Sequence, residues 1–158
     1  MKIMLRRVKL LFFEEFSSNH AFLAALFAWM VAQILKVFTK FLFQKKWDFK
    51  RLAGSGGLPS SHSAFVMALS TNIGRQTGFN STQYAIALAM GLIIMYDAAG
   101  VRRAAGTQAK IINKLIDDVY HQRPEFMKET LKELIGHTPF EVIAGAALGI
   151  LIGGWFGF

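Results

Sequence analysis

Long apolar runs with almost no charge constrain this chain more than any other feature. The runs are residues 20–43, 63–74, 81–96 and 142–158. A helix of roughly 20 apolar residues crosses a hydrocarbon core about 30 Å thick. The first run has that length and carries only Lys36 and Lys40 as charges, whereas the second is shorter and more polar. We therefore expect an all-α, polytopic membrane helical bundle of about four embedded helices, one of them short.

The composition supports a membrane protein and excludes several other classes. Apolar residues make up 53% of the chain and the mean hydropathy is +0.36, which excludes intrinsic disorder. The sequence contains no cysteine, so disulfides, zinc–thiolate sites and thiol catalysis are excluded. Lysine and arginine total 18 against 10 acidic residues. In so apolar a chain this excess favours an anionic membrane surface over nucleic acid as the partner.

The charged segments divide the chain into an amino-terminal region and a membrane domain. Residues 1–19 place four basic residues beside an apolar stretch that Glu14 and Glu15 interrupt. This pattern predicts an amphipathic interfacial helix better than it predicts a signal peptide. Residues 20–158 form the membrane-embedded domain.

The direction of each apolar run decides which polar segments share a side of the membrane. If each run reverses the chain, the 44–62 loop and the charged 97–137 segment lie together on one side, called side B below. Within that segment we expect amphipathic helices over 104–120 and, more briefly, over 124–135. Side B collects most of the reactive residue types: Lys36, Lys40, His62, Asp97, Arg102, Arg103 and His137. The inference depends on the short second run reversing the chain.

A glycine-rich string, GGLPSSHSA at 56–64, opens the second run. Pro59 stands before Ser60, which is a favourable helix N-cap. The free N–H groups that follow, including that of Ser61, form an anion site. His62 lies within the first turn and can donate a proton to a leaving oxygen. The alternative is an ordinary helix cap with an incidental histidine.

A second string, GHTPFE at 136–141, places His137 and Glu141 four residues apart on one face of a helix. A carboxylate beside an imidazole fixes its tautomer and raises its basicity, so His137 can attack phosphorus and form a phosphohistidine. The alternative is structural, because Thr138 and Glu141 also form a capping box with Pro139 at the first helical position. Both roles remain open for Glu141.

A third string, YDAAGVRRAAG at 96–106, follows the third apolar run. Guanidinium groups bind oxyanions in a bidentate manner, so Arg102 and Arg103 suit a phosphate at the membrane face. Asp97 is costly at the end of a lipid-facing run unless it is paired or functional. The alternatives are a salt bridge from Asp97 to one of these arginines and a metal site that it forms with Glu133 or Glu141.

Two features inside the apolar runs also need an explanation. Lys40 lies near the end of its run and can extend to the interface, whereas Lys36 lies deeper and has more need of a partner. In the last run Gly145, Gly149 and Gly153 repeat every four residues, which permits close helix packing. This glycine stripe packs either within the monomer or in a homodimer, and both interpretations stay open.

The three strings together resemble one family. GGLPSSHSA, YDAAGVRRAAGTQAKIIN and LKELIGHTPFEVIAGAALG look like the divergent branch of the type-2 phosphatidic acid phosphatase superfamily, which is related to acid phosphatases and vanadium-dependent haloperoxidases. The resemblance covers about residues 30–155. It implies an all-helical phosphatase that needs no metal and no cofactor.

The resemblance also implies roles for individual residues. The string PSSH at 59–62 resembles the superfamily's Pro-Ser-Gly-His motif, so His62 inherits the role of the acid that protonates the leaving group. The string HTPFE at 137–141 resembles its His-x-x-x-Asp motif. His137 is then the nucleophile and Glu141 its orienting carboxylate.

Two parts of the superfamily pattern are missing. The Ser-Arg pair expected before the nucleophilic histidine is Thr130-Leu131 here, and no Lys-x6-Arg-Pro motif is present. Because a phosphate site needs several cations, Lys36, Arg102 and Arg103 are the expected substitutes.

We therefore expect a lipid phosphate phosphatase that hydrolyses a phosphomonoester through a phosphohistidine. The alternatives are a non-catalytic binder or transporter of phosphorylated lipid and a structural membrane subunit built on the glycine stripe. Side B carries 11 basic residues against 5 on the opposite side, called side A, so the positive-inside rule favours side B as cytoplasmic. The expected location is a bacterial-type plasma membrane.

Overall fold

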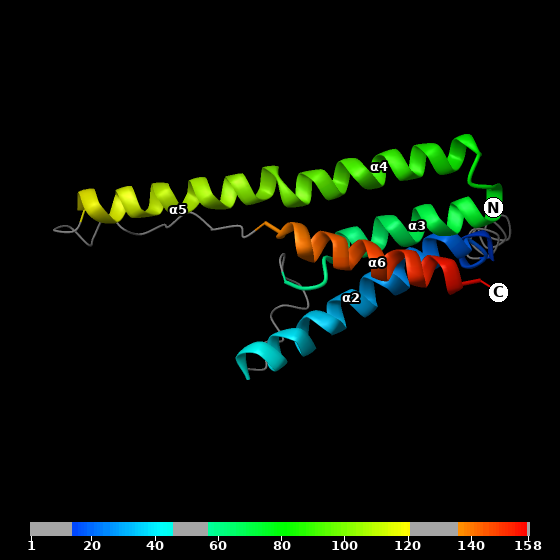
Figure 1. Cartoon of the computed structure of the whole chain (residues 1–158), viewed down its shortest axis with the longest axis horizontal. Helices are drawn as coiled ribbons and strands as arrows, with labels where there is room; N and C mark the ends of the chain where they lie inside the picture. The colour runs from blue at the N-terminus through cyan, green and yellow to red at the C-terminus, as the bar shows by residue number, and fades with distance from the viewer. Residues whose placement is uncertain (1–13, 46–56, 121–135, 158) are drawn as a thin grey trace, which may run out of the picture.

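The computed structural model describes residues 14–45, 57–120 and 136–157. After a single helical turn at 14–17, the elements are α2 (His20–Gln44), α3 (Ser61–Thr77), α4 (Thr82–Ala99), α5 (Val101–Tyr120) and α6 (Pro139–Trp155) (Figure 1). These residues contain no strand. The prediction of an all-α bundle is confirmed.

Capping groups fix where the apolar runs begin and end as helices. Asn19 accepts a hydrogen bond from the N–H of Phe22 at the start of α2, and Ser81 caps α4 in the same way. The first helix ends where Lys45 adopts a left-handed φ of 52° and its N–H bonds to the carbonyl of Phe41. With 25 residues, α2 is about 37 Å long, which is enough to cross a hydrocarbon core of about 30 Å.

The central helix is α3, which runs parallel to α6. At one end the N–H of Ser60 donates to the carbonyl of Glu141 at 2.9 Å. At the other end the side-chain amide of Asn72 donates to the carbonyls of Gly153 and Phe156 at 3.0 and 2.9 Å. The two helices therefore start together on side B and end together on side A.

The other two neighbours of α3 run antiparallel to it. Lys36 of α2 meets Ser61 at the start of α3, and Gly91 of α4 lies against Val66. The core between α2 and α3 consists of the small residues Ala28, Ala32, Ala64 and Ala68, on which Leu148 and Ile152 of α6 pack. Each of these runs reverses the chain, so the predicted threading is confirmed.

The glycine stripe of α6 forms its contact surface with α3. Gly145, Gly149 and Gly153 are buried, and a methyl group added at Gly149 would clash with the backbone of Ala64. The same addition at Gly153 would clash with the backbone of Ala68. Because glycine has no side chain, the backbones of α3 and α6 can approach closely. The stripe packs against α3 within one chain, and the homodimer through the same glycines stays a prediction.

The α4 and α5 helices form an almost continuous rod that extends beyond the rest of the bundle (Figure 1). Gly100 separates them, and its N–H closes α4 on the carbonyl of Tyr96 at 2.9 Å. Several large apolar side chains of α5 are exposed: Val101, Ile111, Ile112 and Leu115. The predicted amphipathic helix over 104–120 is confirmed, with three more residues at its start.

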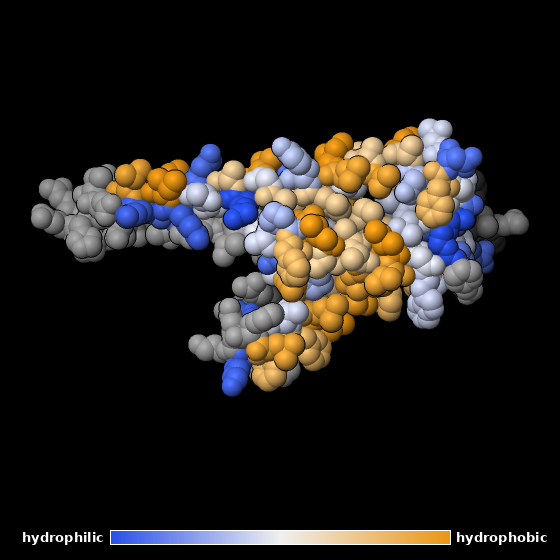
Figure 2. All heavy atoms as spheres, in the orientation of Figure 1, coloured by the Kyte–Doolittle hydropathy of each residue, from blue (hydrophilic) through white to orange (hydrophobic). Residues whose placement is uncertain are grey.

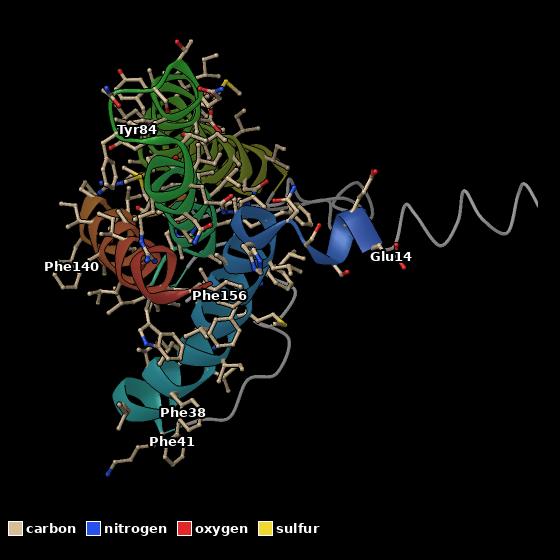
Figure 3. The ribbon with its side chains drawn as sticks, turned by 90° about the vertical axis from the view of Figure 1, so that its right-hand side faces the viewer. Glu14, Phe38, Phe41, Tyr84, Phe140 and Phe156 are labelled. Carbon is tan, nitrogen blue, oxygen red and sulfur yellow. The ribbon has the colours of Figure 1, made fainter. Side chains whose placement is uncertain are left out.

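On the face shown in Figure 2, the middle of the bundle is largely apolar, and hydrophilic residues gather at its right-hand end and along α5. Exposed large side chains include Met30 and Ile34 of α2, Ile86, Met90 and Ile93 of α4, and Ile143, Ile150 and Leu151 of α6. Phe140 extends away from the bundle, whereas Phe156 lies over α2 with its ring 5.8 Å from that of Phe27 (Figure 3). His20–Leu42 and Thr82–Ile116 are long and apolar enough to cross a membrane, and α6 is a shorter apolar helix. A surface this apolar suits lipid rather than water, so the protein is a helical membrane protein.

The second apolar run is longer as a helix than the sequence predicted. The expected range was 63–74, but α3 extends from Ser61 to Thr77. Its polar residues do not end the helix because they are satisfied inside the bundle, as when the Ser70 hydroxyl donates to the Val66 carbonyl at 2.8 Å. The predicted helix over 124–135, and residues 1–13 of the predicted interfacial helix, lie outside the described residues.

Candidate active site

The parallel helices α3 and α6 begin side by side on side B. Besides the bond from Ser60 to Glu141, the N–H of His137 donates to the carbonyl of Ala98 at 3.1 Å. The two bonds join the starts of α3 and α6 to the end of α4, and this meeting point is called the junction below. The first turn of a helix has unpaired N–H groups and the positive end of its dipole, so two such ends together favour an anion.

The imidazole rings of His62 and His137 meet at this junction, one from each helix. Their centroids are 6.0 Å apart and their planes are inclined by 67°. The sequence placed both residues on side B, and the structure brings their rings together. A phosphoryl group between two such rings needs an approach of about 3–3.5 Å on the side of the attacking atom. It also needs a hydrogen bond of about 2.6–3.2 Å on the side of the leaving oxygen, with the P–O bond between the two, so a phosphoryl group in line between the rings requires them to move further apart than in this structure.

Glu141 holds His137 and the start of α6 at the same time. Its Oε2 lies 3.2 Å from Nδ1 of His137 and accepts the N–H of Thr138 at 3.0 Å. The hydroxyl of Thr138 in turn accepts the N–H of Glu141, which completes a capping box. Both interpretations of this residue that the sequence allowed are therefore present together. The carboxylate holds Nδ1, and the other ring nitrogen of His137, Nε2, is buried.

Lys36 reaches the junction from α2. Its side chain is only 1% exposed, and Nζ donates to Oγ of Ser61 at 2.9 Å. The loop before α3 is fastened to α2 as well, because the Thr39 hydroxyl donates to the carbonyl of Leu58 at 2.7 Å. A buried ammonium needs hydrogen-bond acceptors, and the Ser61 hydroxyl is one of them.

Three buried serines surround the start of α3. The Ser63 hydroxyl donates to Oγ of Ser60 at 3.0 Å, and the Ser63 N–H points at the same oxygen at 3.4 Å. The hydroxyl of Ser61 accepts a hydrogen bond from the ammonium of Lys36. The expected cap is therefore present, and it lies directly beside His62.

The third string reaches this junction through the backbone of Ala98, whose carbonyl accepts the N–H of His137. Arg103 is exposed at the start of α5, and the side chain of Arg102 lies outside the described part of the structure. Asp97 is half-buried, one residue before the Ala98 carbonyl that holds His137. Among the described side chains, Lys36 is the cation placed at the start of α3, and the convergence of the arginines stays a prediction.

Two polar residues near the junction were missed by the sequence analysis. Gln33 is buried in α2, and Thr39 connects α2 to the loop before α3. Each lies three residues from Lys36, on the same face of the helix. This spacing of polar residues inside an apolar run indicates which face of α2 is turned toward α3.

The groups at the junction can bind an oxyanion. It combines two imidazoles, a carboxylate, an ammonium and two helix N-termini, a set that suits a tetrahedral phosphate. Within 14–45, 57–120 and 136–157, no three His, Asp or Glu side chains come together as metal ligands. Glu133, a member of the alternative metal site, lies outside those ranges.

Comparison with known proteins agrees with the resemblance seen in the sequence. The family model described as "Divergent PAP2 family" matches residues 17–152. The chain is 40% identical over 148 residues to the uncharacterized membrane protein YuiD of Bacillus subtilis (strain 168). The aligned region covers 87% of this chain and 94% of that protein. No solved structure matches the chain. The chain therefore belongs to the divergent PAP2 family.

Proposed function

We propose that the protein is a membrane-embedded phosphatase that hydrolyses the phosphomonoester of a lipid through a phosphohistidine. The observation that carries this proposal is the pairing of His62 with a carboxylate-bound His137 at 6.0 Å. Membership of the divergent PAP2 family supports a relationship to phosphatases, and the membrane fold supports a lipid substrate.

In the first step His137 attacks phosphorus through Nε2. The N–P bond forms as the P–O bond to the lipid breaks, and Glu141 stabilises the positive charge on the ring through Nδ1–H. His62 gives its proton to the departing lipid oxygen, so the products of this step are a lipid alcohol and a phosphohistidine.

In the second step water attacks the phosphohistidine. His62, now neutral, accepts a proton from that water, the N–P bond breaks, and inorganic phosphate leaves with His137 restored. Lys36 and the N–H groups at the start of α3 stabilise the charge on the equatorial oxygens in both steps. No cofactor takes part.

The location of the site follows from the same proposal. The junction lies at the ends of the membrane helices on side B, where a phosphate headgroup meets water while its tail stays in the bilayer. The excess of basic residues on side B favours the cytoplasmic face of a bacterial-type plasma membrane.

A second candidate function is binding or transport of a phosphorylated lipid without hydrolysis. Two observations favour it: Leu131 stands where the superfamily has an arginine, and Arg103 is exposed. Such a protein keeps Lys36 and the helix N-termini for the phosphate, and it never forms a covalent intermediate.

Phosphate release from purified protein tests the proposal. Phosphatidate, phosphatidylglycerophosphate and polyprenyl phosphates are offered to the wild type, to His137→Ala and to His20→Ala, which changes an exposed histidine on side A. Release by the wild type and His20→Ala, with none above background for His137→Ala, is the expected result. Rapid quenching with a radiolabelled substrate traps a phosphohistidine in the wild type. Saturable binding without that adduct identifies the second candidate.

A further inference from the structure

A cavity of about 390 Å³ lies beside the junction, on the face of α3 that α6 does not cover. Its lining comes from three helices: Leu26 and Trp29 of α2, His62, Phe65 and Val66 of α3, and Ile94 of α4. All of these side chains except the imidazole of His62 are apolar or aromatic. The cavity therefore joins a hydrophobic space to a proposed catalytic group.

The cavity extends from the junction toward the middle of the membrane. Trp29 lies seven residues before Lys36 along α2, which places it about 10 Å deeper. Ile94 lies four residues before Ala98, the residue bonded to His137, which places it about 6 Å deeper. A molecule that reaches from the junction to these residues must be polar at one end and apolar along the rest.

The cavity is open toward the lipid. Trp29 is 40% exposed, and α2 and α4 flank α3 without a substantial contact between them in the described residues. A chain in the bilayer can therefore move sideways into this space without crossing water.

We propose that this cavity holds a hydrocarbon chain of the phosphorylated lipid, with the phosphate at His62, His137 and Lys36. The inference rests on the proposed function and adds the part of the enzyme that recognises the tail. Lipid tails are as apolar as the lining, so moving a chain from bilayer to cavity releases little hydrophobic free energy. The cavity therefore acts by position: it holds the ester oxygen beside His62 and selects chains by their fit.

Substitutions that fill the cavity test this role. Ile94→Phe adds volume to the lining, whereas Ile93→Phe makes the same change at the next residue, which is 64% exposed on the outside of α4. The measured quantity is the ratio of kcat/KM for dioleoyl phosphatidate to that for dihexanoyl phosphatidate. We expect Ile94→Phe to lower this ratio by about tenfold and Ile93→Phe to leave it unchanged. Equal ratios in both variants would overturn the proposal.

A binding measurement separates the tail site from catalysis. Trp29 is the sole tryptophan after Trp47→Phe and Trp155→Phe, and brominated acyl chains quench a tryptophan that they touch. In nanodiscs that contain a small mole fraction of brominated phosphatidate, we expect saturable quenching of Trp29 that unbrominated phosphatidate reverses and that Ile94→Phe weakens.

The outcomes of the two measurements are distinguishable. Saturable quenching without phosphate release would contradict the phosphatase and support the tail site. Equal quenching by brominated phosphatidylcholine at the same mole fraction would mean that the cavity holds any bilayer lipid, and it would overturn the tail site even in an active enzyme.

Discussion

The ammonium of Lys36 donates a hydrogen bond to the hydroxyl of Ser61 at 2.9 Å, and both side chains are almost fully buried. This contact joins the middle of a membrane helix to the first residue of α3, one position before His62. A charge in such a place is expensive and marks a functional site by default. Its partner in the working enzyme is, in our proposal, the phosphate itself.

Removing this charge is expected to reduce catalysis while the fold persists. Lys36→Met keeps the length and apolar stem of the side chain but loses the ammonium. We expect kcat/KM for phosphatidate to fall by about 100-fold or more, the typical loss of one preorganised donor to a charged transition state. Lys40→Met, one turn nearer the interface, is the matched control and should keep near wild-type activity. Loss of the folded protein in Lys36→Met but not in Lys40→Met would show a structural role.

The two roles of Glu141 are separable by substitution. Glu141→Gln can still close the capping box but presents a neutral amide to His137. We expect a roughly 10–100-fold fall in activity, with little change in the temperature of thermal unfolding. Thr138→Ala removes the cap and should lower stability by about 0.5–2 kcal/mol, with the smaller effect on activity. The reverse ranking of the two variants would leave only the capping role.

The role of His62 as an acid predicts a dependence on the leaving group. A lipid alkoxide needs a proton as it departs, whereas a nitrophenolate does not. We expect His62→Ala to lose about 10²–10⁴ in kcat/KM for phosphatidate and far less for p-nitrophenyl phosphate. An equal loss on both substrates would contradict proton transfer to the leaving oxygen.

The orientation of the chain can be tested because the sequence contains no cysteine. Asn80 is exposed in the turn between α3 and α4 on side A, and Lys110 is exposed on α5 on side B. If side B is cytoplasmic, a membrane-impermeant maleimide should label Asn80→Cys in intact cells and Lys110→Cys only after permeabilisation. The opposite pattern would place the junction on the outer face.

The sequence predicted the helices and their directions well because hydropathy reports directly on membrane crossing. The run that begins at His20, the amphipathic pattern of α5 and the capping box at Thr138 all appear in the structure. Once the directions were known, the meeting of His62 and His137 followed from which segments share a side.

The sequence predicted less where the partner of a residue comes from a distant segment. Asn72 looked like a break in an apolar run, but its amide binds carbonyls at the end of α6, 81 and 84 residues away. The cavity lined by Trp29 and Ile94 was not foreseen for the same reason, since three helices contribute to it. Arg103 is exposed at the start of α5, so its expected role in holding phosphate stays a prediction.

The glycine stripe provides a stability test with a control inside the same helix. Gly149 faces the backbone of Ala64, and an added methyl group there would clash with it, whereas one added at Gly154 would meet no atom within 4 Å. Because α3 and α6 carry His62 and His137, separating their backbones would also move the two rings apart. We expect Gly149→Ala to destabilise the folded protein by about 1–3 kcal/mol and to reduce phosphatase activity, while Gly154→Ala leaves both near wild type. Thermal unfolding in detergent measures the first effect. Equal stability of the two variants would mean that α6 does not pack on α3 through this stripe.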